Sequence, residues 1–387
     1  MSIGLGTVNA VAHIAENQNF IDKYEAVVTT FDNDQATDEQ KRNGIVKGRD
    51  ATSSVHLFLG GHGYYAELNT NDLNDYLKEG RGKDLYWTLM KPRKWQHSKV
   101  LEGCSVTLEE INTPIPQGFT IDFLPRFMDM LGTFRPYELS ILLAPPKTGK
   151  SLLAKHIFWQ ARRQGVKTCG AFLEDDTKKL TQSIIALDAG VPIPKFRKDP
   201  TLVSDEKKLE VMNTLFNEDY LQITSEKGHI SPEEVVRLVE YAAQRGTQFV
   251  VFDHLSYVLS GHNTGNERKD IDKLLTDLEA IKKRYPIHIL AIAHITVEKN
   301  RGIKKDKEGD IIYPYWYEVN EYDGRGSSAF TQLCDNMFAI DKQYLEDGSR
   351  GYTRARILLN REEDNTGVCD QLTLDHITGR LQEVAAY

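Results

Sequence analysis

The sequence predicts an α/β protein in which a parallel sheet carries helices on both faces. Short, continuously apolar runs alternate with longer stretches that repeat apolar residues at helical spacing, as in 139–143 and 152–163. Strands buried on both faces read as continuous apolar runs, and strand–helix alternation gives parallel pairing. Beyond residue 336 the chain becomes richer in strands. We therefore expect a large parallel-sheet domain that ends in a strand-rich tail.

Composition is that of an ordinary globular protein. The 387 residues are 40% hydrophobic and 27% charged, which suits two domains or one large domain with an appendage. The four cysteines lack Cys-x-x-Cys spacing, so we expect no disulfide framework and a cytoplasmic protein, in the host cell if it is viral. No apolar run approaches the roughly 20 residues of a membrane span. The net charge of −8 leaves room for nucleic acid only in a local groove or ring channel.

Three parts are expected along the chain: a small α/β domain over 1–99, a linker over 100–118 and the large domain over 119–387. In the linker, 107–111 predicts one or two helical turns before a proline-rich stretch stiffens the chain. Such an arm either packs on a neighbouring subunit or simply tethers the two domains, and the sequence favours neither.

The small domain is predicted to contain two strands and a capped helix. Residues 26–31 read as a strand that ends on Asp32 and Asp34. Two carboxylates at this spacing can share a divalent metal, but a polar turn that closes the strand is the simpler interpretation. A second strand is predicted at 55–59, and the helix at 68–77.

The large domain repeats the strand–helix alternation. Its further predicted strands are 166–173, 220–224, 249–252 and 287–293, with tail strands at 336–340, 354–359 and 371–374. Its further predicted helices are 178–188, 231–245 and 267–284.

The loop at 144–151 reads Ala-Pro-Pro-Lys-Thr-Gly-Lys-Ser and carries the strongest local signal of function. A strand, a tight loop and a helix form a phosphate cradle, because the N–H groups of the loop and helix start face an anion. The residues expected to hold a nucleotide are Ala144, Lys147, Thr148, Gly149, Lys150 and Ser151. Among them, Lys150 would reach the β- and γ-phosphates and Ser151 would ligate Mg²⁺. A chance Gly-Lys-Ser on a surface turn is the alternative.

Three further strand ends carry residues suited to nucleotide hydrolysis. Ligands of open parallel sheets bind beyond the carboxyl ends of the strands. There Glu174 is placed to activate a water, Asp253 to hold Mg²⁺ and His294 to sense the γ-phosphate. Singly they read as a helix cap, a strand end and a core histidine. Together, behind a phosphate loop, they predict a nucleoside triphosphatase that uses Mg²⁺ and ATP or another NTP or dNTP.

Five ordered segments resemble the ring helicases of superfamily 4. The segments resemble, in turn, the catalytic-glutamate strand (172–176), the Walker B region (252–260 with 267–272), the phosphate-sensing histidine (293–294), the DNA-binding loop motif (323–335) and the arginine-finger segment (354–367). The resemblance covers about 118 to the end. It is strongest to the helicase half of the primase-helicases of T-odd bacteriophages and to mitochondrial Twinkle, with bacterial DnaB more distant.

The resemblance implies a RecA-like P-loop core that forms a hexameric ring. ATP would lie between subunits and single-stranded DNA would pass through the centre. Arg361 would be the arginine finger that enters a neighbour's site, or else a surface arginine at a hairpin. Arg325, Gly326 and Ser327 would face the DNA backbone, or else form a glycine-loosened turn.

Three residues depart from the family pattern. Ala144 replaces the first glycine of the loop, so the backbone there must avoid positive φ. Leu359 stands where relatives often carry a second phosphate-contacting lysine, and Thr331 stands where the phage relative has a basic residue. The substitutions at Leu359 and Thr331 affect the expected contacts with the γ-phosphate and with DNA, so nucleotide hydrolysis is a firmer expectation than unwinding.

The small domain resembles the second half of a Toprim primase domain. Residues 2–6 and 31–34 match its later motifs, and Asp72 with 73–77 matches its final acidic region. Toprim chemistry also needs a glutamate from an earlier strand, and neither that residue nor a zinc ribbon is found. We therefore expect no primer synthesis by this domain alone, whether it is a truncated remnant or half of a site completed by another polypeptide.

The leading hypothesis is a replicative DNA helicase: a homohexameric, ATP-driven 5′→3′ translocase on single-stranded DNA, with a primase or polymerase as replisome partner. The runner-up is a RecA-like, DNA-dependent ATPase that loads proteins or assists recombination without unwinding. A third hypothesis is a binding module in which the Toprim-like half docks a primase or polymerase. A metal-dependent nuclease at Asp32 and Asp34 is the most distant.

Overall fold

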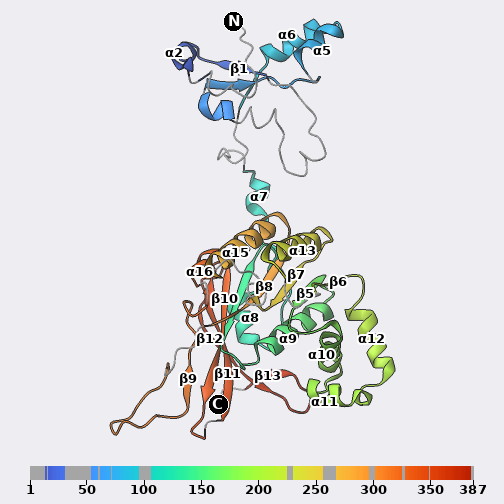
Figure 1. Cartoon of the computed structure of the whole chain (residues 1–387), viewed down its shortest axis with the longest axis vertical. Coiled ribbons are helices and arrows are strands. Elements are labelled where there is room, and N and C mark those ends of the chain that lie inside the picture. The colour runs from blue at the N-terminus through green and yellow to red at the C-terminus, as the bar shows by residue number, and fades with distance from the viewer. Residues whose placement is uncertain are drawn as a thin grey trace. The chain divides into compact units, whose positions relative to one another are not determined.

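The chain falls into two compact units. A computed structural model describes residues 14, 16–30, 54–59, 62–70, 72–95, 106–224, 230–255, 267–295, 301–324, 327–347 and 349–384. One unit covers Met1–Pro114 and the other Ile115–Tyr387 (Figure 1). Within the described ranges, no helix combines the length and the apolar character needed to cross a membrane.

The first unit is built on a small three-stranded sheet. Its strands are β1 (Val27–Thr29), β2 (Gly63–Tyr65) and β3 (Arg93–Lys94), with β1 parallel and β3 antiparallel to β2. Its helices include α2 (Gln18–Ile21), α5 (Leu73–Lys78), α6 (Gly82–Met90) and α7 (Leu108–Asn112). The predicted strand at 26–31 is present as the shorter β1.

The predicted strand at 55–59 is wrong, because residues 54–59 form a helix. Val55 and Leu59 lie four residues apart and are buried against Ile14, whereas Leu57 and Phe58 are exposed. Burial four residues apart is the pattern of a helix, not of a strand. A run of five apolar residues does not by itself distinguish the two structures.

Asp72 has a structural role in this unit. Its carboxylate accepts a 2.9 Å hydrogen bond from the main-chain N–H of Asp75 and so caps helix α5. The predicted helix is therefore present, although it begins at Leu73 rather than at residue 68. Asp32 and Asp34 lie outside the described residues.

Helix α7 forms over the predicted linker turns, and its capping explains why so short a helix begins there. The Thr107 hydroxyl accepts a hydrogen bond from the Glu110 N–H, and the Glu110 carboxylate accepts one of 2.7 Å from the Thr107 N–H. Leu108 and Ile111 on this helix are 73% and 67% exposed.

The second unit is organised around a ten-stranded mixed sheet in the order β13-β12-β11-β10-β4-β8-β7-β5-β6, with β9 paired to the far part of β10 (Figure 1). The strands are β4 (Leu139–Ala144), β5 (Thr168–Phe172), β6 (Tyr220–Gln222), β7 (Phe249–Asp253), β8 (His288–His294), β9 (Tyr315–Tyr317), β10 (Asn336–Tyr344), β11 (Arg350–Asn360), β12 (Gly367–Leu374) and β13 (Leu381–Glu383). The six strands from β10 to β6 are parallel, as predicted. The tail strands β11, β12 and β13 pair antiparallel.

Helices cover both faces of this sheet. The helices are α8 (Pro125–Leu131), α9 (Lys150–Arg163), α10 (Thr177–Ala189), α11 (Ile193–Lys198), α12 (Asp205–Leu215), α13 (Pro232–Gln244), α15 (Glu267–Arg284) and α16 (Ser327–Leu333). Helices α8 to α12 pack on the face that carries Leu142, and α13, α15 and α16 pack on the face that carries Ile141. Because successive side chains of β4 enter two different cores, the strand is apolar at nearly every position.

Candidate functional site

The phosphate loop connects β4 to α9. Ala144 is the last residue of β4, fully buried and paired with His294 of β8. Positive φ angles occur at Lys147 (63°) and Gly149 (86°), not at Ala144. The Thr148 hydroxyl closes the loop by donating a 2.8 Å hydrogen bond to the main-chain oxygen of Pro145. Because the left-handed positions fall elsewhere, alanine is compatible with position 144.

The first turn of α9 places a lysine at the base of the loop. Lys150 is 9% exposed, and burial lowers the pKa of its ammonium, although the carboxylates of Asp253 and Glu174 oppose that shift. The N–H groups in the first turn of a helix have no intrahelical acceptors, so the start of α9 favours an anion. The loop therefore concentrates positive potential where a nucleotide phosphate would bind.

Asp253 ends β7 beside this loop and is 3% exposed. Burial raises the pKa of its carboxyl group, and a hydrogen bond with the Ser151 side chain opposes the shift. The buried Oδ1 atom of Asp253 has no hydrogen-bond partner among the described residues. Oxygen donors with unused lone pairs are the ligands that Mg²⁺ prefers. The predicted pair, Ser151 and Asp253, therefore fits a magnesium ion.

Glu174 follows β5, on the strand next to β7. The main-chain N–H of Leu173 donates a 3.1 Å hydrogen bond to the Asp253 oxygen, so the two strand ends are tied together. The two carboxylates that follow Glu174 have structural partners: Asp175 pairs with Lys155, and Asp176 caps α10. Glu174 itself turns toward the site, where its Oε1 lies 2.9 Å from His254 Nε2.

A continuous polar row crosses the three strand ends. Lys150 Nζ lies 3.3 Å from His294 Nδ1, and His294 Nε2 lies 3.0 Å from His254 Nε2, which in turn contacts Glu174. We call these four residues the polar row. His254 is the member to which the sequence assigns no role. Its only signal there is its position directly after the strand-end aspartate.

Arg361 and the phosphate loop lie at opposite ends of the strands of the sheet. It follows Asn360, which pairs through Asn336 with Ser140 at the start of β4. The loop begins at the other end of this six-residue strand, roughly 17 Å away over five intervals of about 3.3 Å each. The Arg361 guanidinium donates to the main-chain oxygens of Thr331 (3.1 Å) and Gln332 (2.7 Å).

The DNA-loop motif lies next to β8. Gly324 forms an antiparallel bridge with Ile295, the residue that follows His294. Asp323 pairs with Arg301 and accepts a 2.8 Å hydrogen bond from the Asn320 N–H. Of the predicted DNA-facing residues, Arg325 and Gly326 and the side chain of Ser327 lie outside the described structure.

Leu359 and Thr331, the other two residues that depart from the family pattern, lie in different kinds of element. Leu359 lies in β11 opposite Met337 and packs against the core. Thr331 lies in α16 and contributes its main-chain oxygen to Arg361.

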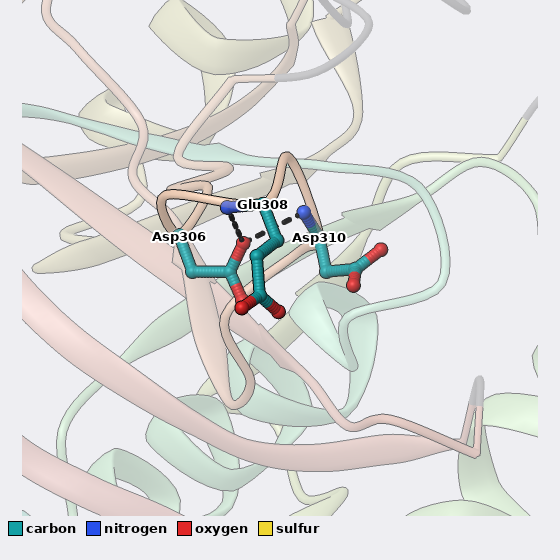
Figure 2. Close-up of side chains that lie close together, drawn as sticks. All are labelled: Asp306, Glu308 and Asp310. Atoms are coloured by element: carbon teal, nitrogen blue, oxygen red, sulfur yellow. Dashed lines mark hydrogen bonds between the residues drawn. The ribbon is translucent and has the colours of Figure 1, made fainter.

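A cluster of three carboxylates lies outside the strand-end site (Figure 2). Asp306, Glu308 and Asp310 are exposed and close together on one turn. The Asp306 carboxylate accepts hydrogen bonds from the N–H groups of Glu308 (3.0 Å) and Asp310 (2.9 Å), and so holds the turn.

Comparison with known proteins identifies the domain. Residues 121–312 match the DnaB-like helicase C-terminal domain family, over the strands that carry the loop, Glu174, Asp253 and His294. These residues are similar to that family. The DnaB-like domain thus contains the whole polar row, whereas Arg361 and the DNA-loop motif follow the matched segment.

Whole-chain and structural comparisons agree with this assignment. The chain is 23% identical over 390 residues to a DNA helicase/primase of Enterobacteria phage T3, covering 99% of this chain and 65%, just under two thirds, of that protein. A solved structure described as an ATPase domain superposes with a TM-score of 0.53 at 13% identity, over 68% of this chain and 90% of that one. A DnaB-like replicative helicase, described with its primase interactions, superposes at 0.56 and 13% identity, over 80% and 73%. The fold is therefore RecA-like.

Proposed function

We propose that the DnaB-like domain hydrolyses ATP, or another nucleoside triphosphate, to drive a replicative DNA helicase. One observation carries the proposal: the parallel strands bring Lys150, Glu174 and His294 into one connected polar row, with Asp253 beside it. A lysine, a carboxylate base and a γ-phosphate sensor around one phosphate loop are the parts that nucleotide hydrolysis needs.

In this mechanism the residues act from separate strands. The loop N–H groups and Lys150 bind the phosphates and neutralise the charge that develops on them. Glu174 orients the attacking water and accepts its proton, and His294 contacts the γ-phosphate. Ser151 and Asp253 would hold Mg²⁺, which supplies further charge neutralisation when bound.

The position of Arg361 supports a site shared between subunits. A residue roughly 17 Å from the loop of its own subunit does not reach that loop, since an extended arginine side chain spans far less. Packing the Arg361 end of one copy on the loop end of the next would bring the two together. Repeating that contact generates a ring, and we propose a hexamer.

The helicase assignment adds single-stranded DNA as the second ligand. It is supported by the family match, by the T3 helicase/primase relative and by the DNA-loop motif beside His294. We propose 5′→3′ translocation on DNA held in the ring, in the cytoplasm where the DNA is replicated. Exposed Leu108 and Ile111 on α7 support an arm that packs on a neighbouring subunit.

The first unit is proposed to dock a primase or polymerase rather than to synthesise primers. Asp72 belongs to the Toprim-like acidic region of this unit, and its carboxylate is used to cap helix α5. We retain the domain boundaries 1–99, 100–118 and 119–387 as the proposed functional division.

Two measurements test the function. Lys150→Ala should abolish DNA-stimulated ATP hydrolysis, and normal turnover in that variant would contradict the site. Strand displacement on a forked duplex with a 5′ single-stranded tail should require ATP. Hydrolysis without strand displacement would favour the loader or recombination accessory. That alternative is considered because Leu359 and Thr331 depart from the family pattern.

A further inference from the structure

We propose that His254 is a positioning residue that holds Glu174 in place and makes that hold depend on His294. The inference rests on the proposed hydrolysis of ATP, because it assigns Glu174 the role of base. It concerns the one member of the polar row without a role of its own.

The geometry makes His254 the common partner of both residues. Its Nε2 lies 2.9 Å from Glu174 Oε1 and 3.0 Å from His294 Nε2. The two imidazole rings lie 4.0 Å apart at 71° to each other. His254 follows directly after Asp253, the last residue of β7, and β7 is paired with the strand that precedes Glu174. The imidazole therefore has a fixed backbone origin relative to the carboxylate it contacts.

The difference in burial shows which residue orients the other. His254 is 7% exposed, whereas the Glu174 side chain is 56% exposed. An exposed glutamate has several rotamers of similar energy, and immobilising such a side chain costs conformational freedom. A hydrogen bond from a buried ring selects one of these rotamers. Glu174 is thus held by His254, not the reverse.

Hydrogen-bond chemistry makes the two contacts of His254 compete. A carboxylate oxygen only accepts, so the contact with Glu174 requires a hydrogen on His254 Nε2. The Lys150 ammonium only donates, so it occupies the lone pair of His294 Nδ1 and leaves the hydrogen of that ring on Nε2. Two N–H groups then face each other over 3.0 Å, and this contact opposes the contact with Glu174. When His294 turns toward a γ-phosphate, the N–H of His254 becomes available to Glu174 alone. The hold on the base is therefore strongest when the sensor is engaged elsewhere.

The backbone extends this dependence toward the DNA-loop motif. Ile295, directly after His294, is bridged to Gly324 at the start of the proposed DNA-facing segment. A shift of that segment moves the end of β8 and with it His294. Through His254 the same shift changes how firmly Glu174 is held, so stimulation of hydrolysis by DNA should depend on the chemistry of residue 254.

Two substitutions separate the hydrogen bond from the space it fills. His254→Leu removes the donor, and we expect turnover of ATP to fall about 10- to 100-fold, as when an orienting partner is lost. The Kd for a non-hydrolysable ATP analogue should stay within about threefold. His254→Gln keeps a donor at the same distance along the side chain, but its amide can donate through N–H to Glu174 and accept through its oxygen from His294 at once.

The glutamine variant should therefore keep basal turnover within about threefold and lose most of the stimulation by a poly-dT oligonucleotide. His376→Gln, at an exposed histidine in the turn before β13, is the matched control and should behave as the unsubstituted protein. Full turnover with normal stimulation in both His254 variants would overturn the inference, as would identical defects in the two. If the leucine variant does not fold, the glutamine variant decides through its stimulation. Absence of hydrolysis in the unsubstituted protein would instead contradict the proposed function.

Discussion

Arg361 donates a 2.7 Å hydrogen bond to the main-chain oxygen of Gln332, in the last turn of helix α16. The donor is the proposed arginine finger, and the helix lies within the DNA-loop motif at 323–335. The guanidinium caps main-chain carbonyl groups at the C-terminal end of this helix. If Arg361 reaches a neighbour's nucleotide as proposed, it must release these carbonyls, so movement of the proposed finger is coupled to helix α16.

The first prediction concerns Arg361 itself. Arg361→Ala should lower ATP turnover by about 10³-fold or more, because an arginine finger contributes 10³ to 10⁵ to this reaction. Assembly, measured by sedimentation, should be retained. Mixing this variant with Glu174→Gln should restore part of the activity, since some interfaces then pair an intact loop site with an intact finger. No recovery in mixed assemblies would argue for a finger that acts within its own subunit, or for none.

The second prediction concerns the cost of Asp253 to folding. Burial raises the folded pKa of this carboxyl group above its unfolded value, so the ionised form at neutral pH is penalised by folding. That penalty is absent below the unfolded pKa, near 3.9, and appears as the pH rises through the folded pKa. Asp253→Asn removes the charge and should raise the nucleotide-free Tm by roughly 2–4 °C, or about 1 kcal/mol.

The same variant should lose magnesium-dependent nucleotide binding, measured by titration with a fluorescent ATP analogue. Asp375→Asn, at an exposed turn, is its control and should leave that binding unchanged. An unchanged or lower Tm for Asp253→Asn would contradict the burial argument.

The third prediction concerns the close packing at the DNA-loop motif. A Cβ atom at Gly324 would lie 2.7 Å from the Phe330 ring and 3.1 Å from a Leu143 methyl group. Gly324→Ala should therefore cost about 1–3 kcal/mol of stability and weaken the bridge to Ile295. Gly82→Ala is the matched control, because nothing lies within 4 Å of its Cβ position and its φ is not positive. Equal melting curves for the two variants would refute this account.

The fourth prediction concerns the arm. Leu108→Asp and Ile111→Asp should weaken self-association, because each places a charge on an apolar face that is exposed in one chain. The Tm measured at low concentration should change little, since neither side chain is buried in the single chain. Leu77→Asp, at a residue that is 63% exposed on α5, serves as the control. Normal assembly of both arm variants would favour the simple tether.

The strand-end residues could be predicted because their positions follow from local sequence. Continuous apolar runs ending on Glu174, Asp253 and His294 predict parallel strands, and parallel strands end at one edge of a sheet. Helix α15 was likewise predictable from its apolar periodicity and begins and ends at Glu267–Arg284 as expected. The helix at 54–59 was not, because a short apolar run fits either structure.

His254 could not be predicted for a different reason. Its contacts join residues 80 and 40 positions away, and no local pattern encodes which way an imidazole turns after a strand. The contacts of Arg361 with α16 have the same origin, since they depend on the antiparallel return of β11 beside β10.

The placement of Arg361 and the phosphate loop at opposite ends of the strands of one sheet gives each subunit a donor side and an acceptor side. In the proposed ring, a lone subunit would hold two halves that belong to different sites and would complete neither. An open row of n subunits completes n − 1 sites, and closing the ring adds the last. Specific activity should therefore rise with protein concentration, and opening the proposed ring to admit DNA should leave one site incomplete.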